Sequence, residues 1–191
     1  MRSVTVESVV VEAGGRVLEF KRRLNAPPQA VWAALTEPEK VRQWYATITD
    51  YPVQGQPMQL HFENSNTVVG TTVTRLTRPS VLEYTWDSQA PNASPVSLVG
   101  SVVRFELTPH DAGTLLALDH IFPTDSVSIA DVMGGWQIHL DDLADKLNTG
   151  GFAAAAQPLA ADFLARCSKQ SQLFARALAV ASVQQLSLIH I

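Results

Sequence analysis

Residues 128–147 predict a long helix with a single apolar stripe, and this stripe constrains the fold more than any other feature. Apolar side chains recur here every three or four residues, the spacing that places them on one face of a helix. They are Ile129, Val132, Met133, Trp136, Leu140, Leu143 and Leu147. Aspartates and Lys146 occupy the opposite side. Such a helix needs one broad apolar surface to lie across, which the rest of the chain must provide.

A series of strands is predicted to form that surface. Apolar and polar residues alternate in short segments separated by Pro, Gly, Asn and Asp, a pattern typical of strands and turns. The expected strands are residues 4–11, 17–24, 47–51, 58–63, 67–77, 81–87, 98–108 and 114–122. Each has one face that is more apolar than the other, as in an antiparallel sheet covered on one side.

Two short helices are expected after the second strand, at 28–36 and 37–44. Pro28 and Pro38 suit the first turn of a helix, where the missing N–H costs nothing. Helices this short are not stable alone in water, so they must lie on the sheet. The predicted fold is α+β, a curved antiparallel sheet wrapped around a long helix that follows it.

Composition narrows the classes of function. The net charge is -4 and the isoelectric point about 5.7, so no basic face for nucleic acid is expected. The basic run Lys21 to Arg23 is interpreted as a solvated strand edge. Cys167 is the single cysteine, and no apolar stretch approaches the ~20 residues of a membrane span. We therefore expect a cytoplasmic protein without a disulfide or a membrane span.

The chain is expected to hold one domain, residues 1–151, followed by an alanine-rich tail, residues 152–191. Spacing of apolar residues in the tail predicts an amphipathic helix over part of it. That helix would lie on the domain, cover a pocket or form a homodimer. The last residues, 185–191, are interpreted as an artefact of sequence assembly and are left out of the fold prediction.

Four stretches of the chain carry a family resemblance. In order, they are Ala26 to Trp44, Val81 to Trp86, Gly113 to His120 and Gly134 to Leu147. Together they span about residues 16–150, and they resemble the family of homologues of the activator of heat-shock chaperone ATPase, within the SRPBCC or START-like superfamily. The family usually has a Gly-Gly before the third strand, where this chain has Gln54 to Pro57.

The resemblance implies a helix-grip fold, as in START and Bet v-like proteins, with an internal cavity. It implies no fixed activity, because relatives include chaperone activators, lipid carriers and polyketide cyclases. Function must therefore be argued from the residues that could line the cavity.

Aromatic residues are the main functional signal. We expect a ligand-binding wall that combines apolar rings with indole N–H and phenol hydroxyl groups, which orient a bound molecule. Its predicted members are Trp44, Tyr45, Tyr84, Trp86, Phe105, Leu118, His120, Met133 and Trp136. The alternative is that these side chains only fill the core.

The histidines offer limited chemistry. His120 lies on the inward face of its strand, either as a core residue or as a polar contact to a ligand, whereas His139 is expected at the rim or in water. His61 and Glu63 are expected to share a strand face, either as an exposed pair or as an acid and base at a pocket wall. No histidine spacing is typical of a metal site, and no nucleophile motif is present. We expect no metal, no cofactor and no defined catalytic set.

Gly134 and Gly135 would let the helix approach the sheet closely or widen the cavity mouth.

Three functions remain open. The first is binding of a hydrophobic or amphipathic small molecule, lipid-like or polyketide-like, in the cavity. The second is an enzyme of the cyclase or dehydratase kind, with His120 or the His61–Glu63 pair moving protons. The third, a regulator that binds a heat-shock chaperone and activates its ATPase, rests on the resemblance alone. The residues favour the first.

Overall fold

The computed structural model describes residues 5–12, 15–89, 98–123, 129–152, 165–173 and 175–176. Seven strands form one antiparallel sheet in the order β1-β2-β7-β6-β5-β4-β3. Their bounds are β1 Thr5–Glu12, β2 Gly15–Leu24, β3 Pro57–Phe62, β4 Thr67–Thr77, β5 Val81–Gln89, β6 Val102–His110 and β7 Gly113–Phe122. The predicted curved antiparallel sheet is confirmed, with β2 beside β7 rather than beside β3.

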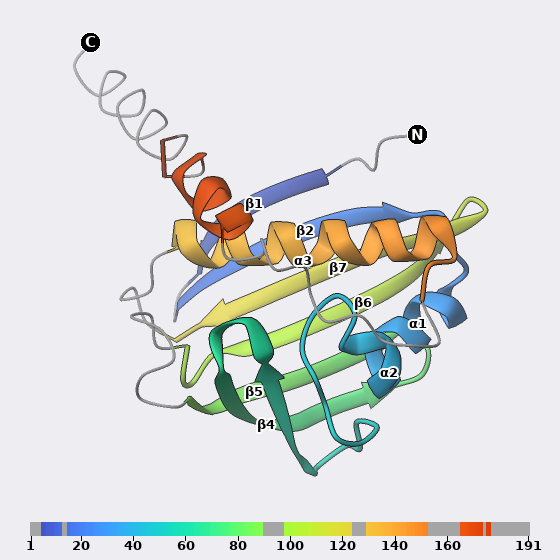
Figure 1. Cartoon of the computed structure of the whole chain (residues 1–191), viewed down its shortest axis with the longest axis horizontal. Helices are drawn as coiled ribbons and strands as arrows, with labels where there is room; N and C mark the ends of the chain where they lie inside the picture. Colours follow the sequence, from blue (N-terminus) through green and yellow to red (C-terminus); the bar gives the residue numbers. More distant parts are fainter. Residues whose placement is uncertain are drawn as a thin grey trace.

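Helices cover one face of this sheet. The long helix α3, Ile129–Thr149, crosses it diagonally, while α1, Pro28–Thr36, and α2, Pro38–Val41, lie near one end (Figure 1). These two helices carry the chain from β2 to the opposite edge strand, β3. The sheet, the long helix and the two short helices after an early strand confirm the predicted helix-grip architecture.

The core lies between the sheet and the helices, on the face that the alternation predicts. In β7 every second residue from Thr114 to Phe122 is buried, and the residues between them are half-exposed. The stripe of α3 meets this face with Val132, Met133, Trp136, Leu140 and Leu143 buried. Each such side chain contributes about 1.5–3 kcal/mol when fully buried, so the stripe fixes α3 on the sheet.

Arg22 corrects the expectation of a solvated basic run. Its side chain is only 1% exposed, because it lies on the same inward face of β2 as Leu18 and Phe20. It donates a hydrogen bond from Nη2 to Oε1 of Gln137 on α3, at 2.8 Å. β1 pairs with the outer side of β2, so β2 is an interior strand. The cation therefore joins sheet to helix instead of facing water.

Three elements differ from the prediction by more than two residues at a boundary. Residues 47–51 form no strand, only an isolated bridge between Thr47 and His61, because the chain turns away before Pro52 and cannot follow β3. The second helix ends at Val41 and continues as turns. β6 begins at Val102, since Gly100, with φ of 88°, turns the chain just before it. Residues 90–97 and 124–128 lie outside the described residues.

A helical segment of the tail, residues 165–173, lies against α3 (Figure 1). Arg166 forms an ion pair with Asp142 at 2.8 Å. A Cβ atom on Gly134 would lie 2.8 Å from the amide nitrogen of Ser171 and 3.0 Å from the carbonyl oxygen of Cys167. Gly134 therefore permits close approach of the tail, not of the sheet, which corrects the prediction. Residues 175–176 are also helical, and the remainder of the predicted tail helix lies outside the described residues.

Gly134 and Gly135 make a matched pair for testing this contact. A Cβ on Gly135 would meet nothing within 4 Å. Because alanine favours a helix over glycine by about 0.5–1 kcal/mol, we expect Gly135→Ala to raise the free energy of unfolding by that amount. Gly134→Ala should lose part of this gain and speed hydrogen exchange at residues 165–173, measured by mass spectrometry. Equal exchange in the two variants would show that the tail does not depend on Gly134.

Candidate functional site

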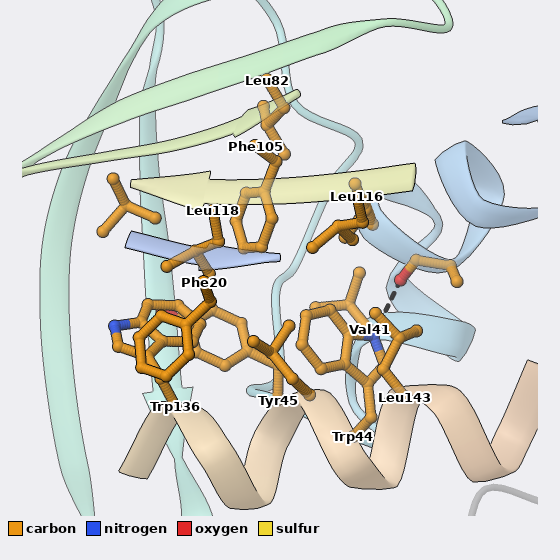
Figure 2. Close-up of a cluster of buried hydrophobic side chains, with 14 of the residues drawn as sticks. Phe20, Val41, Trp44, Tyr45, Leu82, Phe105, Leu116, Leu118, Trp136 and Leu143 are labelled. Atoms are coloured by element: carbon orange, nitrogen blue, oxygen red, sulfur yellow. Dashed lines mark hydrogen bonds between the residues drawn. The ribbon is translucent and has the colours of Figure 1, made fainter. Parts of the chain in front are cut away.

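The predicted aromatic residues gather into one buried cluster between the sheet and α3 (Figure 2). Tyr45 lies between two indoles, with ring centroids 5.3 Å from Trp44 and 5.1 Å from Trp136, both stacked. Phe105 meets Trp136 edge-on at 5.9 Å. Offset and edge-on ring pairs of this kind contribute about 0.5–1.5 kcal/mol beyond their buried area. All nine predicted site residues are at most 6% exposed.

Further rings belong to the cluster and were missed by the prediction, among them Phe62 and His139. Phe62, the last residue of β3, stacks on Trp86 at 6.1 Å and meets Tyr45 edge-on at 5.2 Å. His139 meets Tyr45 edge-on at 5.0 Å. Alternation in β3 places Leu60 and Phe62 on one face, and this signal would have found Phe62. No local pattern identifies His139, which lies at the flank of the α3 stripe.

His139 is buried, so the expectation of a rim or solvent position was wrong. It is 7% exposed, and Nδ1 donates a hydrogen bond to the carbonyl oxygen of Trp44 at 2.8 Å. That carbonyl follows the short helix α2, where the chain leaves helical geometry and a backbone acceptor becomes available. Burial lowers the pKa of His139 to about 4, and the Trp44 hydrogen bond offsets only part of this effect. The ring is therefore neutral at pH 7.

His120 is a satisfied core residue. Nδ1 accepts a hydrogen bond from the indole N–H of Trp136 at 3.0 Å, so the neutral ring carries its proton on Nε2 and donates to Oγ of Ser101 at 2.8 Å. Burial lowers the pKa of His120 to about 3. With both ring nitrogens occupied and no proton gained near neutral pH, His120 is unsuited to moving protons to a substrate.

The alternative acid–base pair is not assembled. Glu63 lies in the short 3-10 turn Glu63–Ser65, not on the strand with His61, so the expected shared face was wrong. Its carboxylate accepts a hydrogen bond from the Thr47 hydroxyl at 2.7 Å. No hydrogen bond or ion pair joins Glu63 to His61 in the part of the chain that the structure describes.

A pair of phenol groups supplies the polar part of the cluster. The hydroxyl oxygens of Tyr45 and Tyr84 lie 3.0 Å apart and share one hydrogen bond. Burial raises the pKa of both hydroxyls well above the usual range, so both keep their protons. Two hydroxyls carry two protons, and their mutual bond uses only one. One proton is thus left to donate, among the residues that the structure describes.

Trp86 adds a second donor to this core. Its Nε1 is buried and has no hydrogen-bond partner within the described ranges. The indole lies between Phe62 and His120, stacked on both rings. An unmade hydrogen bond of a buried group costs about 1–3 kcal/mol, so these donors favour an added acceptor.

A small void borders the phenol pair. Its volume is about 20 Å³, and its walls come from α1, α2, the segment after α2 and strands β3, β5 and β6. It is lined by Leu35, Val41, Trp44, Tyr45, Ile48, Pro52, Met58, Leu60, Leu82, Tyr84 and Phe105. Four predicted site residues thus line it, whereas Trp86, Leu118, His120, Met133 and Trp136 do not. The space lies toward the short helices and not beneath the middle of α3.

A larger cleft opens on the surface beside the void. It has a volume of about 380 Å³ and is formed by the segment between α2 and β3 and by the beginning of β3. Its lining consists of Thr49, Asp50, Tyr51, Pro52, Val53, Gln56, Pro57, Met58 and Gln59. Sequence reasoning missed this cleft, because it assigned 47–51 to a strand and the following residues to a plain turn.

Other chemistry is limited in the described residues. No three His, Cys, Asp or Glu side chains gather there in a way that would hold a metal ion. Burial raises the pKa of the half-buried Cys167 thiol to about 11, which disfavours the reactive thiolate. None of the helices in these ranges is long and apolar enough to cross a membrane.

Comparison with known proteins identifies the family. The profile described as Activator of Hsp90 ATPase homolog 1-like protein matches residues 25–148, which include α1, the void and most of α3. The chain belongs to this family. The predicted resemblance is therefore confirmed. No curated protein matches the sequence significantly.

Solved structures of this family type share the fold. CalU16 from Micromonospora echinospora is 20% identical, with a TM-score of 0.62 over 92% of this chain and 98% of that one. DynU16, a protein in the dynemicin biosynthetic locus, is 25% identical with a TM-score of 0.61, over 70% of this chain and 48% of that one. The Aha1 dimer from Colwellia psychrerythraea is 21% identical with a TM-score of 0.59, over 71% and 98%.

The buried histidines predict a pH-dependent stability. A histidine with a pKa of 6.5 in the unfolded chain and about 4 in the folded protein binds its proton more readily when unfolded. The free energy of unfolding should therefore fall as the pH drops from 6.5 to 4, and His139 alone accounts for about 3 kcal/mol of this loss.

The test uses urea unfolding between pH 8 and pH 4 for the parent protein and His139→Gln. Glutamine keeps a donor for the Trp44 carbonyl and cannot be protonated, so the variant should lose less stability over this range. All other titrating groups are common to the two proteins. If the free energy of unfolding fell equally with pH in the two proteins, the neutral, buried state of His139 would be contradicted.

Proposed function

We propose that this domain binds a hydrophobic or amphipathic small molecule between its sheet and its short helices. The observation that carries the proposal is the Tyr45–Tyr84 pair: both residues line an otherwise apolar void, and their shared hydrogen bond leaves one hydroxyl proton to donate. Ligand sites commonly combine an apolar lining with a few placed polar groups. A core that served packing alone would be filled equally well by phenylalanine at these two positions.

The size of the void sets what binding requires. A volume of about 20 Å³ holds one water molecule, so a ligand must displace surrounding side chains to enter. Met58 has an unbranched, flexible side chain, and α2 is only four residues long. This side chain and this short helix yield more readily than the backbone of the seven-stranded sheet.

The ligand class follows from the lining. An apolar body replaces the contacts among the rings and the leucines, and one acceptor oxygen, a carbonyl or an ether, receives the spare phenol proton. A lipid-like or polyketide-like molecule has both parts. The location of DynU16 in the dynemicin biosynthetic locus supports a compound of the second kind.

Two dyes test this function. Prodan is a fluorescent naphthalene with one ketone oxygen, and naphthalene itself has no acceptor. We expect the parent protein to bind both, with a blue shift of prodan emission. The double variant Tyr45→Phe, Tyr84→Phe should bind prodan about tenfold more weakly, the value of one hydrogen bond, and naphthalene no more weakly than before.

The controls separate binding from folding. Thermal unfolding by circular dichroism should show that the double variant remains folded, since each change removes one oxygen and keeps the ring. Loss of affinity for both dyes to the same degree would argue against the phenol pair as the polar contact. Absence of dye binding to the parent protein would overturn the proposal.

The comparisons also support a second role, as a regulator that binds a heat-shock chaperone. The matched family is described by activation of the Hsp90 ATPase, and the solved relative from Colwellia psychrerythraea is described as a dimer. A steady-state ATPase assay with the chaperone of the same organism tests this role, and sedimentation tests dimer formation. Stimulation that is unchanged in the double tyrosine variant would favour a chaperone partner over a small molecule.

A further inference from the structure

The surface cleft and the inner void share a wall. Pro52 and Met58 line both spaces, so the cleft and the void beside Tyr45 and Tyr84 adjoin at these two side chains. Pro52 is buried and its ring has little freedom. Met58 is half-buried, packs against the core, and has an unbranched side chain with three rotatable bonds.

The backbone around this wall is held in place. The amide of Gly55 donates to the carbonyl of Val73 at 2.7 Å, and the amide of Val73 donates to the carbonyl of Gln56 at 3.1 Å. The hydroxyl of Thr71 donates to the carbonyl of Met58 itself at 2.9 Å. Because the backbone is held, we expect rotation of the Met58 side chain to be the movement that joins cleft and void.

The rim of the cleft suits an amphipathic molecule. Tyr51 is 56% exposed and Val53 55% exposed, and both belong to the small set of large apolar side chains that lie open in the described ranges. Exposed apolar groups gathered at a concave surface mark binding sites more often than scattered ones. Thr49, Gln56 and Gln59 add polar groups that can meet a ligand's hydrophilic end.

The charge of the cleft lining limits the kinds of head group that a ligand can place there. Asp50 is the charged residue of the cleft lining, and it is exposed. An anionic head group would lie beside this carboxylate, whereas a neutral hydroxylated or a cationic amine head group would not be repelled. The effect is small for an exposed charge, because water and salt screen it.

We propose that the cleft formed by residues 49–59 is the mouth of the binding site and that Met58 controls access to it. The molecule enters with its apolar end toward Tyr45 and Tyr84 and leaves a neutral or cationic head group in the cleft. This inference rests on the proposed function, because it names the path and the ligand class for the same site.

Methionine methyl groups provide a direct test in the unmodified protein. The chain has three methionines, Met1, Met58 and Met133, so selective labelling with carbon-13 gives a spectrum of three methyl signals. Met133 is buried on α3 and lines neither space, which makes it an internal control. On titration with prodan, the Met58 signal should shift much more than the Met133 signal.

Rates of binding test the role of the side chain. Met58→Ala widens the passage and should speed prodan association several-fold in stopped-flow fluorescence, whereas Met58→Trp should slow it at least tenfold. Met133→Ala, which removes a buried methionine elsewhere, should leave the association rate within twofold. Circular dichroism at the assay temperature checks that each variant is folded. If the larger tryptophan prevents folding, the association rate of Met58→Ala alone tests the role of this side chain.

The head group is tested by displacement of prodan. Decylamine should displace the dye at a lower concentration than decanoate, and Asp50→Asn should narrow the difference. An equal effect of the two compounds on the parent protein would overturn the assigned head-group class.

The outcomes distinguish an error in the location of the mouth from an error in the proposed function. If prodan binds but the Met58 signal and the rates in both Met58 variants are unchanged, the mouth lies elsewhere and the proposed function stands. If prodan does not bind the parent protein at all, the proposed function is wrong and the mouth with it.

Discussion

The indole of Trp136 is the contact on which the rest of the domain depends. It projects from the middle of α3, stacks on Tyr45, and donates its N–H to His120 on β7. A long helix contacts the sheet through a single apolar stripe. At one position of that stripe, an indole supplies buried apolar area, a stacked ring contact and a hydrogen bond. Tyr45 and His120 in turn bring the short helices and the turn before β6 into the same cluster.

Polar groups in this core divide into two kinds. His120 has partners on both ring nitrogens, and Arg22 donates to Gln137 from beneath α3. These bonds fix the position of the helix, because breaking one would leave a buried polar group unpaired. The phenols of Tyr45 and Tyr84 are different, since their shared bond leaves one proton unused at the edge of a void. The incomplete pair lies where the short helices, not α3, close the core.

Much of the fold could be predicted because it follows from periodicity. The stripe of α3, the inward face of β7 and the first turn of α1 at Pro28 each depend on local spacing or on proline chemistry. The candidate site was predicted only in part. Aromatic residues on inward faces had to be buried, but which of them border empty space depends on how α1, α2 and the following segment meet the sheet. The burial of His139 likewise depends on a carbonyl 95 residues away in sequence.

The sequence by itself determined the strands, the long helix and the side chains that must leave water, because alternation and helical spacing act over a few residues. Only the tertiary structure decided where a void or a cleft remains between those side chains. The void beside Tyr45 and Tyr84, the cleft of residues 49–59 and the two residues between them arise where three segments distant in sequence converge. Cavities are differences between the volumes of many packed groups, and no local pattern records such a difference.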